Sequence, residues 1–233
     1  MQLVKSALGA ARTAVDGAAA WGAVAVDDFT HLPRVLDGND IDAWDPDYIR
    51  RVLPLWRAAL GTYFRAEVRG LDNIPETGPA LLVGNHSGGT KIVDTFIFAS
   101  EFYGHFGPDR RFHQLAHDIA ARLPATGLSR WGTVAASHRN AHRAFDRDAP
   151  VLVYPGGDWE TFRPSWHSDR IEFAGRKGFI RLALDRGVPI VPVVAIGGQE
   201  TALFASRGER LAEATGWARL TRIKVLPVAF APP

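Results

Sequence analysis

Short apolar segments alternate with amphipathic segments along most of the chain, and this alternation constrains the fold more than any other feature. Three segments contain no charged residue: residues 80–84 and 151–154 resemble buried strands, and residues 189–196 resemble a third apolar strand. Four segments carry helical patterns: residues 45–62, 92–103, 137–145 (with Ser137 as a favourable N-cap) and 177–186. Because strands separated by helices pair in parallel, the sequence predicts an α/β fold with a central, mostly parallel sheet flanked by helices.

Further segments have weaker patterns. Apolar and charged residues alternate over residues 64–69, which predicts a half-buried strand. Residues 111–117 and 223–230 are additional strand candidates, and residues 201–220 include one more helix. No internal repeat is visible, so we expect one layered domain preceded by an N-terminal segment.

The first 44 residues differ from the rest in composition and charge. Residues 1–26 have the Ala-rich pattern of a helix, and residues 37–42 form a polar turn rich in Asp. Residues 1–44 carry three basic and six acidic side chains, so their net charge of −3 leaves +5 for the remainder of a chain whose total is +2. We therefore expect an N-terminal helical arm over residues 1–44, a candidate for shallow membrane attachment, and a main domain over residues 45–233.

Composition excludes several classes of function. The chain has no cysteine, which rules out disulfides, thiolate metal centres and a cysteine nucleophile. Two histidine pairs, His113 with His117 and His138 with His142, lack carboxylate partners at ligand spacing, so we expect no metal site. No segment has the roughly 20 strongly apolar residues that a membrane-spanning helix needs. The modest positive charge of the main domain suits an anionic ligand or a lipid surface, and it is too dispersed for nucleic acid.

A glycine-rich segment that contains a histidine follows the first apolar strand. Its sequence is Gly84-Asn-His-Ser-Gly-Gly89, and Asp94 lies near the start of the next predicted helix. In one continuous helix His86 and Asp94 would be about 12 Å apart along the axis, so they can meet only if the glycines let the chain loop outwards. A histidine oriented by a carboxylate can serve as a general base. Alternatively, His86 is a turn residue and Asp94 only stabilises the helix N-terminus.

Two more polar motifs follow further along the chain. The sequence Tyr154-Pro-Gly-Gly-Asp-Trp-Glu160 joins a tight turn to acidic residues directly after a predicted strand. Arg176 and Lys177 stand where a predicted helix begins, and basic side chains beside free backbone N–H groups can bind an anion. Taken alone, the first motif is ordinary turn chemistry and the second a solvated basic turn.

The order of these motifs resembles the glycerolipid (lysophospholipid) acyltransferase superfamily. The resemblance covers about residues 64–200 and rests on four blocks: Asn85-His86 with Asp94, Tyr154-Pro-Gly-Gly157, Arg176-Lys-Gly-Phe179 and Val188-Pro-Ile-Val-Pro-Val193. It implies that residues 45–233 form an acyltransferase domain, which moves an acyl group from a coenzyme A or acyl carrier protein thioester to a lipid hydroxyl without a cofactor. It also implies a cytoplasmic enzyme held peripherally at the inner face of a membrane, with the lipid acceptor and the acyl thioester as partners.

The resemblance makes His86 the expected base and Asp94 its orienting partner. Acyl transfer from a thioester also needs hydrogen-bond donors for the oxyanion that forms on the carbonyl oxygen. For this role we expect the backbone amides of Gly88 and Gly89, or the side chain of Lys91. The thiolate leaves easily, so the reaction needs neither a strong acid nor a cysteine.

The acceptor site is less well defined by the sequence. We expect Gly157, Asp158 and Glu160 to line it, and Arg176 and Lys177 to contact a phosphate of the acceptor or of coenzyme A. The family pattern places its His and Asp closer together than the seven intervening residues found here, and the usual Phe-Pro-Glu-Gly-Thr-Arg block has lost a Glu and an Arg. The Pro-Gly-Gly block with its later Glu, and the Arg-Lys-Gly-Phe block, are similar to the diacylglycerol acyltransferase branch.

Several functions therefore stay open at this point. The acceptor hydroxyl is that of a glycerolipid such as 1-acylglycerol-3-phosphate, or that of a neutral mono- or diacylglycerol. The stretched His–Asp spacing also fits a catalytically silent lipid-binding module on the same fold. A thioesterase-like hydrolase, in which water replaces the alcohol, is a weaker alternative. The sequence leaves the acyl chain length and the oligomeric state undetermined.

Overall fold

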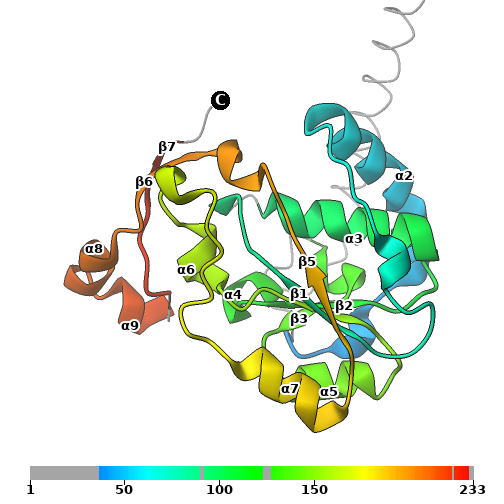
Figure 1. Ribbon diagram of the computed structural model, residues 1–233. Helices are drawn as coiled ribbons and strands as arrows, with labels where there is room; N and C mark the ends of the chain where they lie inside the picture. Colours follow the sequence, from blue (N-terminus) through cyan, green and yellow to red (C-terminus); the bar gives the residue numbers. More distant parts are fainter. Residues whose placement is uncertain (1–36, 90–91, 123–126, 222, 231–233) are drawn as a thin grey trace, which may run out of the picture.

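The computed structural model describes residues 37–89, 92–122, 127–221 and 223–230, which build a five-stranded sheet between layers of helices (Figure 1). The strands, in their order across the sheet, are β3 (Thr133–Ala135), β2 (His113–Ala116), β4 (Val151–Val153), β1 (Leu81–Gly84) and β5 (Ile190–Val193). Every neighbouring pair is parallel. The predicted α/β fold with a central parallel sheet is confirmed.

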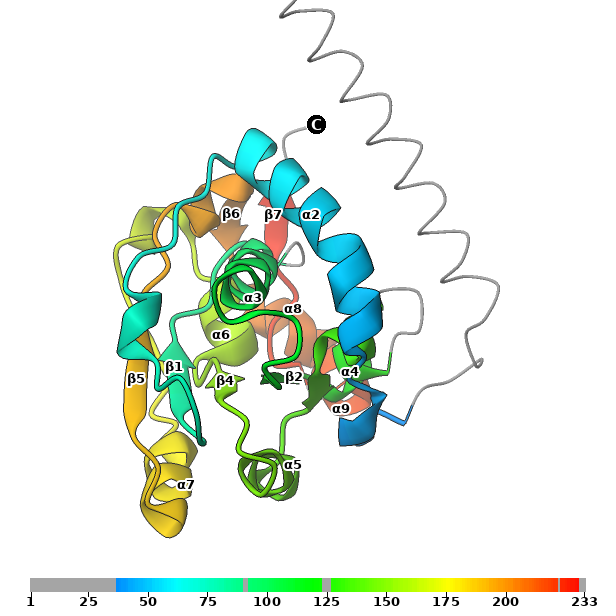
Figure 2. The ribbon, with the colours of Figure 1, turned by 90° about the vertical axis from the view of Figure 1, so that its right-hand side faces the viewer.

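Helices cover both faces of this sheet. On one face lie α2 (Pro46–Tyr63) and α3 (Val93–Phe106), and on the other lie α5 (His138–Phe145) and α7 (Gly178–Arg186), as Figures 1 and 2 show. Shorter α-helices in the described part are α4 (Asp118–Ala121), α6 (Gly157–Thr161), α8 (Glu209–Ala214) and α9 (Trp217–Thr221). Short 3-10 helices span Ile41–Ala43, Leu71–Asn73, Leu128–Trp131, Ser165–His167 and Gly198–Thr201. A separate antiparallel ribbon pairs β6 (Leu203–Ser206) with β7 (Val228–Phe230).

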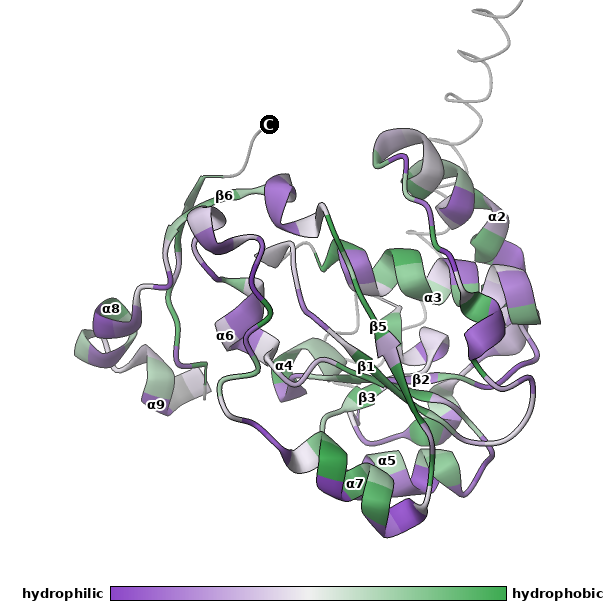
Figure 3. Ribbon diagram, in the orientation of Figure 1, coloured by the Kyte–Doolittle hydropathy of each residue, from purple (hydrophilic) through white to green (hydrophobic). Residues whose placement is uncertain are grey.

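The sheet contributes to two hydrophobic cores because successive strand residues point to opposite faces. Leu82 and Leu152 pack with Phe102 of α3 in the first core. Leu81, the neighbour of Leu82, packs with Leu182 of α7 in the second. Figure 3 shows the corresponding strands as hydrophobic segments. Burial on both faces explains why these strands are apolar without alternation.

Capping side chains mark where α2 and α5 begin. Asp45 accepts a hydrogen bond from the N–H of Tyr48 at 2.9 Å, and Pro46 occupies the first helical position of α2. Ser137 accepts one from the N–H of Asn140 at 3.1 Å, which confirms the predicted N-cap of α5.

The structure differs from the sequence-based predictions in several places. The strand predicted over residues 64–69 is absent, because Arg65 takes a positive φ of 50° at the end of α2 and the segment then lies along a cleft described below. The three-residue strand β3 was not predicted. Residues 201–220 hold one strand and two short helices rather than one helix, and the last strand is limited to Val228–Phe230.

The predicted N-terminal helix of residues 1–26 lies outside the described residues. Of the expected arm, only residues 37–44 are described, and they pack on the main domain. The side chain of Ile41 is fully buried in the core that contains α5 and α7. Asn39 also accepts a hydrogen bond from the side chain of Asn140 at 3.0 Å. These residues are therefore continuous with the domain that follows them.

His113 makes folding stability depend on pH. It is fully buried, it hydrogen-bonds the carbonyl of Gly132 through Nδ1 at 3.0 Å, and burial lowers its pKa to about 4. The neighbouring Arg111 and Arg147 also lower this pKa, whereas Asp42 raises it. The unfolded chain then binds more protons than the folded chain between the ordinary histidine pKa of 6.5 and about 4, so stability falls as the pH falls through this window.

We expect His113→Asn, which keeps an N–H donor for Gly132, to remove this pH dependence. The free energy of unfolding of the unsubstituted protein should fall by about 3 kcal/mol from this group between pH 7 and pH 4. Urea unfolding across that range measures the difference, with the exposed His138→Asn as the control. An equal slope in all three proteins would contradict the assignment.

Candidate active site

The loop after β1 brings His86 and Asp94 together. Gly88 and Gly89 take positive φ values of 84° and 58°, which turn the chain outwards before α3 begins. Asp94 lies in the first turn of α3, and its Oδ2 is 2.9 Å from Nδ1 of His86. The predicted contact between these two side chains is therefore present despite the seven intervening residues.

Asp94 is held in one orientation by further hydrogen bonds. Its Oδ2 accepts from the backbone N–H of Ser87 at 2.8 Å, and its Oδ1 accepts from that of Thr95 at 2.8 Å. Its side chain is only 1% exposed. An ionised carboxylate only accepts hydrogen bonds, so Nδ1 of His86 carries the proton in this contact. Nε2 is then left as the ring's basic atom, and no hydrogen bond from another described residue reaches it.

The imidazole ring of His86 lies against Tyr154. The two rings are stacked, with centroids 4.4 Å apart and planes 11° from parallel. A side chain at Gly84 would come within 2.6 Å of the Tyr154 ring, so glycine is required where β1 ends. Burial raises the pKa of Tyr154 well above its ordinary value, which keeps the phenol neutral beside the histidine.

Two buried side chains hold the main chain of His86. Oε2 of Glu160 accepts from the His86 N–H at 2.9 Å, and Nη1 of Arg163 donates to the His86 carbonyl at 2.8 Å. Glu160 is 0% exposed and Arg163 2%. A carboxylate enclosed in this way faces the histidine loop and not a ligand, so the expectation that Glu160 lines the acceptor site is wrong.

Asn85 joins the same loop to the end of β5. Its side-chain amide donates to the carbonyl of Ala195 at 2.8 Å and accepts from the Ala195 N–H at 2.7 Å. The histidine loop is thus tied to the neighbouring strand by two hydrogen bonds of one side chain. Asn85 and Arg163 were not predicted as functional residues, although Asn85 belongs to the histidine motif.

An apolar cleft of about 230 Å³ opens beside this pair. Asp94 and Tyr154 form part of its wall. The rest comes from three segments: residues 66–71, α3 near Ile97, and residues 191–196. The charged side chains in this wall, other than Asp94, are Glu67 and Arg69, which pair with each other at 2.8 Å. The side chains that line the cleft are therefore mostly apolar, and of the histidine–aspartate pair Asp94 is part of the wall while His86 is not.

Comparison with known proteins assigns a family to this arrangement. Residues 65–196, which hold His86, Asp94 and most of the cleft, match the family model described as Acyltransferase. This segment is more than half of the chain. The chain belongs to the acyltransferase family. No solved structure matches it.

Curated relatives share part of this acyltransferase chain. An uncharacterized protein of Mycobacterium tuberculosis is 31% identical over 160 residues, which cover 67% of this chain and 44% of that protein. The human "DGAT1/2-independent enzyme synthesizing storage lipids" is 29% identical over 147 residues, which cover 62% of this chain and 44% of the enzyme. Phytyl ester synthase 2, chloroplastic, of Arabidopsis thaliana is 28% identical over 141 residues, covering 56% and 19%. The chain thus matches less than half the length of each of these relatives.

The remaining predicted site residues of the acyltransferase form a second cluster. Oδ1 of Asp158 pairs with Arg176 at 2.9 Å, and its Oδ2 accepts from the backbone N–H of Lys224 at 3.1 Å. Arg176 also donates to the carbonyl of Gly156 at 2.7 Å, close to Gly157. A phosphate could meet Arg176 only in competition with these partners. Contact of Gly157 and Asp158 with an acceptor stays a prediction.

Three of the expected residues have other positions. Lys177 is exposed and directly precedes α7, with no capping hydrogen bond from its side chain. Gly89 lies under the ring of Phe204, where any side chain would come within 2.5 Å of that ring. Lys91 lies outside the described residues. The oxyanion roles of Gly88, Gly89 and Lys91 stay predictions.

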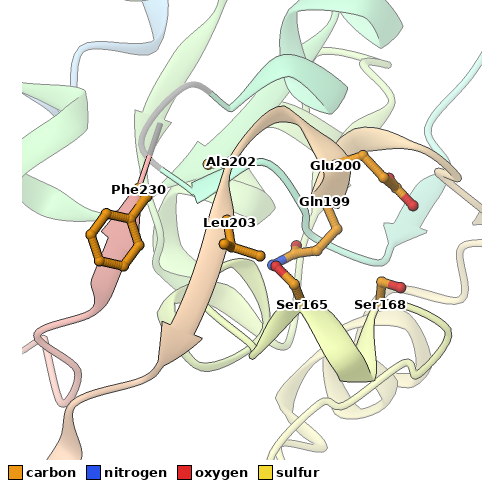
Figure 4. A pocket seen from close by; sticks show the side chains of 7 residues that line it. All are labelled: Ser165, Ser168, Gln199, Glu200, Ala202, Leu203 and Phe230. Atoms are coloured by element: carbon orange, nitrogen blue, oxygen red, sulfur yellow. The ribbon is translucent and has the colours of Figure 1, made fainter. Parts of the chain in front are cut away.

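A second cavity has a volume of about 450 Å³, and Figure 4 shows the side chains that line it. Leu203 of β6 and Phe230 of β7 contribute apolar side chains to its wall, and Gln199 and Ser165 contribute polar ones (Figure 4). Its wall contains neither His86 nor Asp94. This cavity therefore does not supply the reacting groups.

The described ranges of the chain lack two other features. Within those ranges, no group of three or more His, Asp or Glu side chains is arranged to hold a metal ion. None of the helices in the described part combines the length and apolar character needed to cross a bilayer.

Proposed function

We propose that this chain transfers an acyl group from a thioester to a lipid hydroxyl, with His86 as the general base. The contact of His86 with the buried Asp94, which leaves Nε2 basic, supports this most directly. Nε2 takes the proton of the alcohol while the alcohol oxygen attacks the thioester carbonyl. The tetrahedral intermediate then expels the thiolate, which recovers the proton from the imidazolium.

Asp94 has two roles in this mechanism. It fixes the tautomer that carries the proton on Nδ1, and its negative charge stabilises the imidazolium while the proton is on the ring. The oxyanion of the intermediate needs donors, for which we propose the amides of Gly88 and Gly89, or Lys91. No cofactor takes part in these steps.

We propose a neutral lipid alcohol as the acceptor, in preference to 1-acylglycerol-3-phosphate. The side chains that line the cleft at Asp94 are mostly apolar, and its Glu67 and Arg69 are paired with each other. Arg176, the expected phosphate ligand, is bound to Asp158 and to backbone carbonyls. The relatives named for storage lipids and for phytyl esters agree with an apolar product.

The proposal also covers the acyl donor and the location of the enzyme in the cell. We propose acyl-CoA or an acylated carrier protein as the donor, and peripheral contact with the inner, cytoplasmic face of a membrane. Two apolar side chains of the cleft wall, Val194 and Ile196, are 65% and 93% exposed. Side chains of this kind beside a substrate cleft favour contact with lipid.

Product analysis tests the function. The purified chain is given isotopically labelled acyl-CoA together with a long-chain alcohol, a monoacylglycerol, a diacylglycerol, 1-acylglycerol-3-phosphate or no acceptor, and products are identified by mass spectrometry. We expect labelled esters of the neutral alcohols. Exclusive acylation of 1-acylglycerol-3-phosphate would reverse the choice of acceptor. Free fatty acid without acceptor would indicate a hydrolase, and binding without turnover a silent lipid-binding module.

A further inference from the structure

Glu160 and Arg163 are fully enclosed behind the histidine loop, and their polar atoms are used on backbone groups. Glu160 accepts from two backbone N–H groups, that of His86 at 2.9 Å and that of Glu172 at 3.0 Å. Arg163 donates to the carbonyl of His86 at 2.8 Å and to that of Glu160 at 3.0 Å. The N–H and the C=O of the same residue, His86, are thus each held by a buried charged side chain.

Arg163 extends this hold to a neighbouring segment. Its Nε donates to the carbonyl of His167 at 3.2 Å and its Nη2 to that of Ser168 at 3.1 Å. Its own carbonyl accepts from the side chain of Gln199 at 2.8 Å. The guanidinium therefore fixes the position of His86 relative to residues 160–168, which lie on a different part of the chain.

Burial of the charged side chains of Glu160 and Arg163 has an unfavourable free energy. Desolvation raises the pKa of Glu160 and lowers that of Arg163, so the site penalises both charged forms. Charge-assisted hydrogen bonds offset part of this cost, and they hold geometry better than neutral ones. A buried apolar pair would fill the same space without fixing the two backbone groups of His86.

We propose that Glu160 and Arg163 are positioning residues, which hold the main chain of His86 so that its ring meets Asp94. This inference rests on the proposed function of His86 as the base. Neither side chain contacts a reacting atom; both act through the backbone of His86. A displacement of about 1 Å in a reacting group can reduce turnover by about 100-fold, so the hold on the main chain matters for catalysis.

Two variants of similar volume test the proposal. In Glu160→Gln the amide can accept only one of the two backbone N–H groups, and its NH₂ opposes the other. In Arg163→Lys the positive charge is kept, but one ammonium cannot reach the four carbonyls. We expect kcat to fall by about 10- to 100-fold in both, with KM changed little. Glu101→Gln on α3, which breaks the partly exposed pair with Arg57 of α2, is the matched control and should leave kcat unchanged.

A second readout does not depend on turnover. The proton on Nδ1 of His86, shared with Asp94, should give a downfield proton resonance that disappears in His86→Gln. We expect this resonance to shift or broaden in Glu160→Gln and in Arg163→Lys, and to persist in Glu101→Gln. Since it reports geometry and not catalysis, it tests the positioning role even if the chain proves to have another activity.

Spectra and rates are recorded well below the melting midpoint of each variant. If Glu160→Gln does not fold, the resonance and kcat of Arg163→Lys alone test the positioning role. A lower melting midpoint with an unchanged resonance and unchanged kcat would show that the two residues serve stability only, and would overturn the proposal. A raised KM with an unchanged resonance would also overturn it, because the residues would then act on the substrate site.

Discussion

Replacing His86 with glutamine should lower acyl transfer by about 10²- to 10⁴-fold, the range that general-base catalysis contributes. Glutamine is close in size to histidine and can still donate a hydrogen bond to Asp94, so the loop should keep its fold. Its amide cannot take a proton from an alcohol. The alcohol oxygen must then attack without losing its proton to the enzyme. Steady-state rates with the preferred acceptor measure the loss, and the KM for both substrates should change little.

His105 provides a matched control for this variant. It also contacts a carboxylate, with Nε2 3.3 Å from Asp72, but the two side chains are 38% and 90% exposed and lie outside the cleft. His105→Gln should therefore keep full turnover. If His86→Gln retained a rate within about 10-fold of the unsubstituted chain, well inside the range for a general base, His86 would not be the base.

The sheet could be predicted because strands that are buried on both faces are almost entirely apolar in sequence. The runs that became β1 and β4 contain no charged residue because these strands are enclosed on both faces. The run that became β5 is equally apolar, but this strand lies at the edge of the sheet and its residues are exposed or half-buried. Residues 64–69 show the limit of pattern alone. Their alternation fits a strand, but a strand also needs a free sheet edge beside it, and the sequence does not say where that edge lies.

Some residues of the candidate site could be predicted from the sequence and others could not. His86 and Asp94 could be paired in advance because Gly88 and Gly89 offer the loop that their spacing requires. Glu160 could not be placed, because an acidic residue after a glycine turn has the same sequence signature whether it faces solvent or is buried. The short helix α6 turns it inwards, under the histidine loop. No sequence pattern indicated a role for Arg163, apart from its position three residues after Glu160.

Asp94→Asn should be about as damaging as loss of the histidine. Asparagine can place its NH₂ against Nδ1 of His86, and the favoured tautomer then carries the proton on Nε2, where no base remains to receive the proton of the alcohol. We expect turnover to fall by about 10³- to 10⁴-fold, as when a carboxylate that orients a catalytic histidine is made neutral. The variant also tests the tautomer directly, since the ¹⁵N shifts of the His86 ring distinguish a proton on Nδ1 from one on Nε2.

The control for this change is Asp72→Asn, which alters the carboxylate beside His105 and should affect neither rate nor tautomer at His86. Some loss of stability is expected in Asp94→Asn alone, because Asp94 accepts from the backbone N–H groups of Ser87 and Thr95 and the amide can satisfy only part of this set. That loss is separable from catalysis, since it lowers the melting midpoint but leaves the rate of the folded fraction untouched. A folded Asp94→Asn chain with near-normal turnover and the proton still on Nδ1 would show that His86 needs no carboxylate to act, and the stretched spacing would then have no catalytic meaning.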